Sequence, residues 1–256
     1  MVSRTYSRWL VALALVIVAQ ISSRGQTPVG DVLANLKSSD WNIRAHAFKQ
    51  LVDKAVVVDR DALKTALTDL MALEVPTMDS IYRSGTSAPY GEGYSEYISV
   101  LQRTLLNLAA PQDTRAAQLL AQGAYNDDSQ FVVDLARFGE SLVPTIVDMS
   151  KHDVGPKRWN AYGLAGELVK QNRESRITIS STGITQLKDI LRAAVILSDF
   201  SDKIIGVRHL GEAGDITDLP LLQNIAATDT SAGTGRVQFP IRNAALAAIS
   251  AIKSRP

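Results

Sequence analysis

Three histidines, His46, His152 and His209, are the side chains best suited to metal binding or to proton transfer near neutral pH in this sequence. Metal sites usually draw on histidines and carboxylates at short, regular spacing, such as two histidines on one face of a helix. None of the three has another histidine within one helical turn. We therefore expect no metal site, and we predict histidines that are exposed or partly buried.

Carboxylates and nucleophiles give no stronger indication of catalysis. Asp127 with Asp128, and Asp199 with Asp202, could serve acid–base or calcium chemistry, but each pair stands where a helix is expected to begin. Helix capping is the simpler interpretation. No G-x-S-x-G sequence supplies a nucleophilic serine, and the absence of cysteine excludes thiolate chemistry and disulfides. The sequence thus predicts a protein that is not an enzyme and holds no cofactor.

Large aromatic and arginine side chains remain as candidates, because Trp, Tyr and Arg dominate the energetics of protein interfaces. Five positions are predicted to contact a protein partner: Trp41, Arg44, Trp159, Tyr162 and Arg208. Two alternatives stay open. The aromatic rings could pack in the core, and the arginines could pair with turn carboxylates such as Asp40 and Asp153.

The first 25 residues have the layout of a secretory signal peptide. Arg4 and Arg8 precede an apolar run over residues 9–19, and small polar residues follow it up to Gly25. The run is shorter than the roughly 20 residues that cross a bilayer, so cleavage is expected, with a retained anchor as the alternative. We predict a signal peptide over 1–25, a mature domain over 26–256, no stable membrane insertion after cleavage, and a periplasmic or secreted location.

Composition favours a helical protein and disfavours nucleic-acid binding. Hydrophobic residues make up 46% of the chain but aromatic residues only 6%, which suits closely packed helices better than sheets. The N-terminal segment holds three arginines and no acid, so the mature chain has 24 basic and 26 acidic residues, a net charge of −2. Nucleic acids and anionic membranes normally require a clustered basic excess, which this chain lacks.

Helical hairpins are the elements that must position these residues. Residues 32–54 indicate a short apolar helix, a turn with Asp40 and a second helix, and residues 214–253 repeat this plan. Near the start of each predicted second helix, a basic residue is followed by a small residue three places on and an apolar residue seven places on: Arg44, Ala47 and Leu51; Arg158, Ala161 and Ala165; Lys203, Gly206 and Leu210; Arg242, Ala245 and Ile249. The sets are separated by 114, 45 and 39 residues, and helical repeats have periods of about 40–47 residues.

Residues 207–215 (VRHLGEAGD), continuing through LPLL at 219–222, resemble the HEAT-repeat family, including its phycobilisome-lyase-like branch. The resemblance implies an all-α, right-handed α-solenoid of five or six HEAT-like hairpins, with second helices on the concave face. Two activities known among HEAT-like proteins do not carry over. The chain lacks the His-Glu dipeptides with which deoxyhypusine hydroxylase binds iron, and the likeness to the lyases rests on the repeat pattern alone.

The repeat period is blurred between residues 59 and 138. Helices are still predicted over 61–74, 95–109 and 114–124. The segment 84–95, which contains Gly, Pro and Tyr, is predicted to be an irregular surface loop, and 176–183 an extended linker.

These patterns predict an exported, non-enzymatic scaffold that binds a protein partner, since helical arrays expose extended binding surfaces. Two alternatives remain. The chain could bind a small ligand, or act as an enzyme, with the 84–95 loop and its Tyr90 and Tyr94 as a lid. It could also be a structural module of an envelope assembly.

Overall fold

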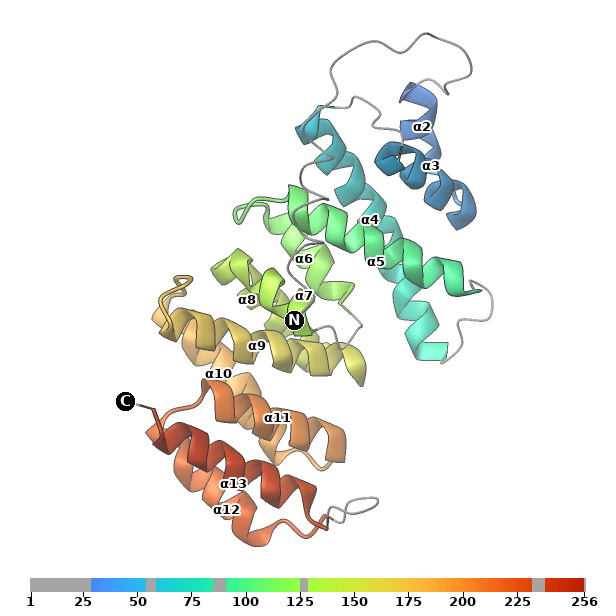
Figure 1. Ribbon diagram of the computed structural model, residues 1–256. Helices are drawn as coiled ribbons and strands as arrows, with labels where there is room; N and C mark the ends of the chain where they lie inside the picture. The colour runs from blue at the N-terminus through green and yellow to red at the C-terminus, as the bar shows by residue number, and fades with distance from the viewer. Residues whose placement is uncertain (1–28, 54–58, 85–90, 125–128, 232–237, 256) are drawn as a thin grey trace, which may run out of the picture. The chain divides into compact units, whose positions relative to one another are not determined.

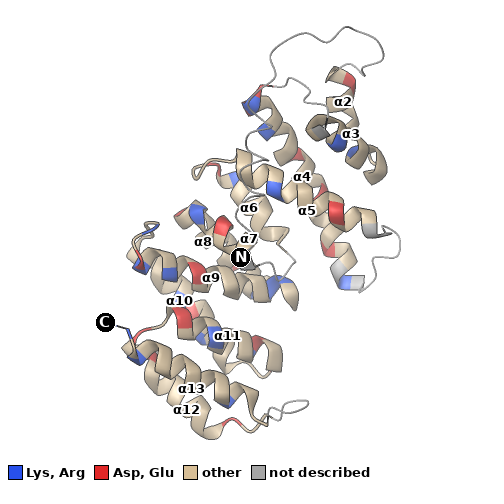
Figure 2. Ribbon diagram, in the orientation of Figure 1, with Lys and Arg blue, Asp and Glu red and all other residues tan. Residues whose placement is uncertain are grey.

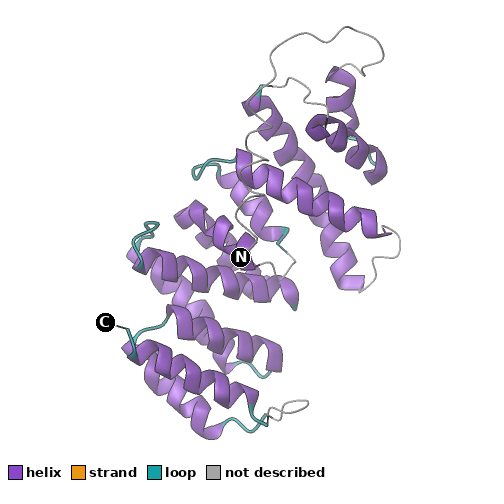
Figure 3. Cartoon of the chain, in the orientation of Figure 1, coloured by secondary structure: helices purple, strands orange, loops and turns teal. Residues whose placement is uncertain are grey.

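The computed structural model describes residues 29–53, 59–84, 91–124, 129–231 and 238–255, and all regular structure in these ranges is helical (Figures 1 and 3). The all-α prediction is therefore confirmed, whereas the predicted signal peptide lies outside the described residues. The chain divides into two compact units, residues 1–105 and 106–256. No helix in the described ranges is both long and apolar enough to span a membrane.

The first unit is built from α2 (Val29–Asn35), α3 (Trp41–Asp53), α4 (Arg60–Ser84) and α5 (Gly91–Leu108), the last of which ends in the second unit. Helices α2 and α3 pack against each other as the hairpin predicted over 32–54. Asp40 lies in the turn between them, where its carboxylate accepts a hydrogen bond from the backbone N–H of Asn42 at 2.9 Å. This contact orders the first turn of α3.

Helix α4 is longer than predicted and includes Pro76 in its interior. A proline removes one helical hydrogen bond and crowds the preceding turn, which is why the sequence indicated an end near residue 74. Val75 and Met78 on either side of it are buried. Packing of this apolar face offsets the local cost and carries the helix ten residues further, to Ser84.

The loop predicted over 84–95 is wrong at its end, because α5 begins at Gly91. Tyr94 belongs to this helix and is only 4% exposed. The predicted lid over a cleft therefore loses Tyr94, while Tyr90 and the rest of 85–90 lie outside the described residues. The repeated Gly and Tyr residues indicated a loop, but the apolar spacing of Tyr94, Tyr97, Ile98 and Leu101, all buried, is helical.

The second unit contains eight α-helices and two short 3-10 helices among its described residues: α6 (Thr114–Gln122), α7 (Ser129–Leu135), η1 (Ala136–Leu142), α8 (Val143–His152), α9 (Pro156–Arg173), α10 (Ser181–Ile196), α11 (Phe200–Ala213), η2 (Ile216–Asp218), α12 (Leu219–Thr228) and α13 (Pro240–Lys253). Helices α8 and α9, α10 and α11, and α12 and α13 form three consecutive hairpins (Figure 1). Helix α9 also packs on α11, and α11 on α13.

Helix starts in the second unit follow simple capping chemistry. Asp199 accepts a hydrogen bond from the backbone N–H of Asp202 at 2.9 Å and caps α11, as predicted. Ser180 caps α10 through the N–H of Gly183. The linker predicted over 176–183 therefore ends three residues early, at this cap. Asp127 and Asp128 lie outside the described residues.

The small residues aligned at the starts of the second helices are all buried: Ala47, Ala161, Gly206 and Ala245. Gly206 shows why size matters there. A Cβ atom on Gly206 would lie 2.6 Å from the Cβ of Ala194 and 3.1 Å from the backbone nitrogen of Val195. Helices α10 and α11 thus approach so closely that this position accepts no side chain.

Candidate functional site

The three histidines lie on three different helices, α3, α8 and α11. Each has one polar neighbour on its own helix: Gln50 for His46, Asp148 for His152 and Glu212 for His209. Within the described ranges, no group of three or more histidine and carboxylate side chains is placed to hold a metal ion.

Arg44, predicted to contact a partner, is instead buried and only 5% exposed. Its Nε donates to Oε1 of Glu74 at 2.5 Å, and its Nη1 donates to the carbonyls of Ser38 and Ser39 at 2.8 and 3.0 Å. A side chain enclosed in this way presents nothing to a partner. The interface prediction is wrong for Arg44, and so is the alternative pairing with Asp40.

Glu74 is the centre of a buried cluster that joins α3, α4 and α5. Its carboxylate, 0% exposed, also accepts hydrogen bonds from the hydroxyls of Tyr94 at 2.8 Å and Tyr97 at 3.0 Å. Burial, together with the negative charge of Glu74, raises the pKa of both tyrosines well above the usual 10, so both remain neutral donors. Trp41 packs edge-on against Tyr94, with ring centroids 5.3 Å apart. We call these residues, with Arg44, the Glu74 cluster.

In the second unit, the predicted interface residues Trp159 and Tyr162 serve the interior. The indole N–H of half-buried Trp159 donates to Asp202 at 2.9 Å, beside Arg158, whose Nε donates to the same carboxylate at 3.0 Å. Tyr162 is 2% exposed, and burial raises its pKa to about 12. The interface prediction is therefore wrong for Tyr162, and Trp159 already uses its only donor.

The aligned basic residues of the second unit connect neighbouring helices, whereas the alternative interpretation of the arginines was pairing with turn carboxylates such as Asp153. Arg158 of α9 bonds to Asp202 of α11, Lys203 of α11 pairs with Asp229 at 3.1 Å, and Arg242 donates to the carbonyl of Ala226 at 2.8 Å. Asp153, the expected partner of Arg158, lies 3.5 Å from Lys157. The Arg158 and Lys203 contacts hold consecutive hairpins in register, whereas the Arg242 contact joins the two helices of one hairpin.

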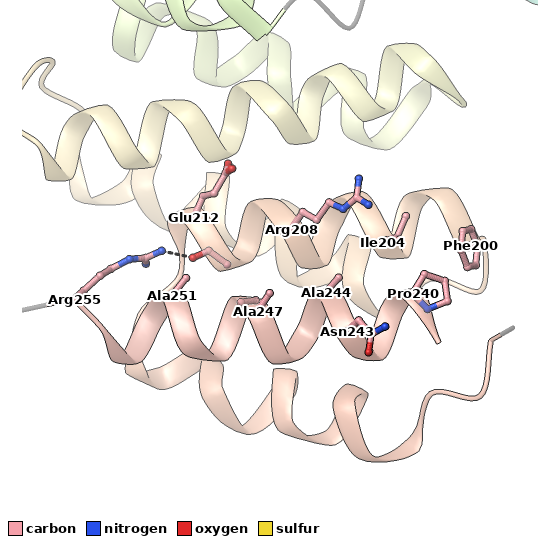
Figure 4. Close-up of a pocket in the computed structure, with 12 residues that line it drawn as sticks. Phe200, Ile204, Arg208, Glu212, Pro240, Asn243, Ala244, Ala247, Ala251 and Arg255 are labelled. Atoms are coloured by element: carbon pink, nitrogen blue, oxygen red, sulfur yellow. Dashed lines mark hydrogen bonds between the residues drawn. The ribbon is translucent and has the colours of Figure 1, made fainter. Parts of the chain in front are cut away.

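Arg208 is the exposed member of the predicted interface residues, whereas Trp41 and Trp159 are half-buried. It is exposed on α11, and its guanidinium makes no hydrogen bond or ion pair with any residue that the structure describes. Figure 4 shows the side chain extending from α11 beside a surface groove. An unpaired arginine in such a place is available to an external carboxylate.

The groove lies between α11 and α13 and has a volume of about 710 Å³ (Figure 4). Its lining falls into three parts, and we call it the α11–α13 groove. Phe200, Ile204 and Pro240 form an apolar end, and Ala244, Ala247 and Ala251 form a floor of small residues. Glu212 and Arg255 form a charged end, and Arg208 lies between the two ends. Helix α13 has charged side chains only near its two ends, Arg242 and Lys253, so the floor is apolar (Figure 2).

The charged side chains of the groove, Arg208, Glu212 and Arg255, have an excess of positive charge. The Glu212 carboxylate lies 2.9 Å from Nδ1 of His209, and this hydrogen bond, with the charges of Lys170 and Arg255, lowers the pKa of Glu212. Arg255 donates to the carbonyls of Gly211 and Gly214, and Arg173 donates to that of Glu212 at 2.9 Å. The single acid is thus already neutralised, while Arg208 has no counter-charge among the described residues.

The groove and the Glu74 cluster were both missed from sequence, and one of them left a detectable pattern. Glu74 follows Leu70 by four residues and Met71 by three, and precedes Met78 by four, and all three are buried. A lone acid on the apolar face of a helix indicates a buried partner. The groove residues come from two helices, and none of them is a lone acid on the buried apolar face of its helix, as Glu74 is in α4.

The sequence matches no protein-family model, and it matches no curated protein at a significant level. A functional proposal therefore depends on the fold and on the α11–α13 groove. An apolar floor beside an unpaired cation suits the non-covalent recognition of a ligand that is apolar on one face and negatively charged.

Proposed function

We propose that this chain is an exported, non-enzymatic α-solenoid scaffold of HEAT-like hairpins that binds a protein partner through its second helices. The α11–α13 groove is the observation that carries the proposal. It combines exposed apolar surface with Arg208, an unpaired side chain of the type that most often dominates interfaces. Of the predicted interface residues, Arg208 is retained as a principal contact.

The packing of the second unit supports the solenoid part of the proposal. In a solenoid, each hairpin contacts its neighbours in sequence and so buries an apolar stripe that it could not bury alone. Helices α9, α11 and α13 are the second members of three hairpins, and each packs on the next. The basic residues that cross between hairpins, Arg158 among them, add polar links to the same stack.

Export is proposed from the arginine-flanked apolar run over 9–19. We expect mass spectrometry of the protein from a bacterial host with an intact secretion system to show a mature N-terminus near Gln26. Recovery of the intact chain from Met1 in the cytosol would contradict export, without bearing on the fold.

A small-ligand site is the second candidate, because the volume of the groove falls within the range of about 300–1,000 Å³ that is usual for ligand pockets. The lid version of this candidate is not retained, since Tyr94 is buried in α5. The described residues that line the groove belong to α11 and α13, with Arg255 just beyond the end of α13 (Figure 4), and a groove along two helices favours an elongated ligand such as a polypeptide.

Partner capture tests the scaffold proposal. The full chain and two charge-reversal variants, Arg208→Glu in the groove and Lys253→Glu outside it, would be used as bait in envelope extracts after crosslinking. We expect Arg208→Glu to reduce capture of a stoichiometric partner at least tenfold (about 1.4 kcal/mol), because like charges then oppose each other, and Lys253→Glu to leave capture unchanged. Equal capture by all three baits would contradict binding at this surface.

A further inference from the structure

We propose that the α11–α13 groove receives an amphipathic α-helical segment of a partner protein, about three turns long, apolar where it meets α11 and α13 and acidic where it passes Arg208. This inference rests on the proposed scaffold function and specifies the chemistry of the partner. The length of the groove, the absence of backbone-binding groups along its floor and its charge each support one part of it.

The length of the groove sets the length of the segment. Phe200 and Glu212, at opposite ends of the groove in Figure 4, are 12 residues apart on α11. At a rise of about 1.5 Å per residue they span about 18 Å, which corresponds to a helix of slightly more than three turns. Such a segment would reach from the apolar end of the groove to its charged end.

The floor favours a helix over an extended strand. An extended segment needs hydrogen bonds for its own backbone, but Asn243 is the only uncharged polar side chain among the groove residues. Beyond their first turns, the backbone N–H groups of α11 and α13 are bonded within those helices, whereas a docked helix satisfies its own backbone groups. Ala244, Ala247 and Ala251 are small enough for a third helix axis to approach to about 8–10 Å.

The charges favour acidic residues in the segment. Arg208 has no counter-ion among the described residues. Burial, followed by the positive charge of Arg173, lowers the pKa of Arg255. Glu212 is compensated by His209, Lys170 and Arg255. A carboxylate placed beside Arg208 would therefore meet a positive field, whereas a lysine there would meet a like charge.

Two synthetic 15-residue amphipathic peptides test this inference directly. They share one leucine and alanine face and carry glutamate or lysine at the flanking positions. Fluorescence anisotropy with the full chain at low salt is expected to show at least tenfold tighter binding of the glutamate peptide, and a smaller preference at 0.5 M salt because of screening. Arg208→Glu should remove this preference, and Lys253→Glu should leave it within twofold.

A groove-filling variant separates docking from general attraction between charges. Ala247 is exposed on the floor, so Ala247→Trp should block both peptides without disturbing the core. Leu246→Trp is the matched control, because Leu246 is exposed and is not one of the groove residues, and one helical residue turns its side chain about 100° away from Ala247. Circular dichroism should show unchanged helical content for both variants. Equal inhibition by the two tryptophans would overturn docking in the groove.

The remaining outcomes distinguish this inference from the scaffold proposal. Binding of the lysine peptide as tightly as the glutamate peptide would overturn the acidic specificity. Failure of both peptides to bind, while partner capture still depends on Arg208, would overturn the helical segment and leave the scaffold proposal standing. Partner capture that is indifferent to Arg208→Glu would count against the scaffold proposal itself.

Discussion

Replacement of Ala245 by glutamate is expected to lower the free energy of unfolding of the second unit by at least about 4 kcal/mol. Ala245 is 0% exposed and lies on the face of α13 that also buries Ile241 and Ala248. A glutamate there would overfill a close-packed contact, at a cost of about 1–3 kcal/mol. It would also place an unpaired carboxylate in an apolar environment, which adds several kcal/mol or forces the group to become protonated. Urea unfolding followed by circular dichroism measures the loss.

Leu246→Glu is the matched control, because it introduces the same side chain one residue further along α13. Leu246 is 57% exposed, so its replacement should change stability by no more than about 0.5 kcal/mol. The contrast isolates burial from helix propensity and from net charge. Comparable losses in the two variants would show that the face of α13 has been assigned incorrectly.

The small-residue register was predictable from sequence because helical periodicity brings residues three, four and seven apart to one face. Ala47, Ala161, Gly206 and Ala245 are all buried as this register requires. The apolar residue seven places after the basic residue fits this register less well. Ile249 is only half-buried, since α13 packs on its neighbours through Ile241, Ala245, Ala248 and Ile252.

The same register could have corrected the prediction for Arg44. Arg44 precedes the buried residues Ala47, Phe48 and Leu51 by three, four and seven places, so it lies on the same inward face. The register could not predict which residue Arg44 pairs with. Glu74 is 30 residues away on another helix, and a contact of that kind depends on how helices pack, which local periodicity does not determine.

Residue type alone gave a poor prediction of the interface. Tryptophan, tyrosine and arginine combine apolar bulk with hydrogen-bond donors, and this combination is as useful in a buried polar cluster as on a binding surface. Tyr162 and Arg44 illustrate the buried use. Arg208 differs because the neighbouring core positions of α11, Val207 and Leu210, take the inward face and leave it exposed.

The Glu74 cluster leads to the second strong prediction, that Glu74→Gln lowers the free energy of unfolding of the first unit by about 3 kcal/mol. Removing one partner of a buried ion pair typically costs about 3–5 kcal/mol, because the remaining charge loses its compensation. Glutamine keeps one acceptor oxygen, which places the estimate at the lower end, but its amide donors would face Arg44 or one of the tyrosine hydroxyls. Hydrogen exchange of amides in α3, α4 and α5 would report the loss, with α11 and α13 as an internal reference.

Asp61→Asn supplies the matched control on the same helix. Asp61 lies 3.4 Å from Lys64, but its side chain is 84% exposed, and exposed ion pairs contribute about 0–1 kcal/mol. The two substitutions make the same chemical change, from carboxylate to amide, in opposite environments. If Glu74→Gln cost no more than Asp61→Asn, burial would not be what makes this ion pair important. A loss confined to α3, α4 and α5 in Glu74→Gln would instead show that one buried carboxylate holds these three helices together.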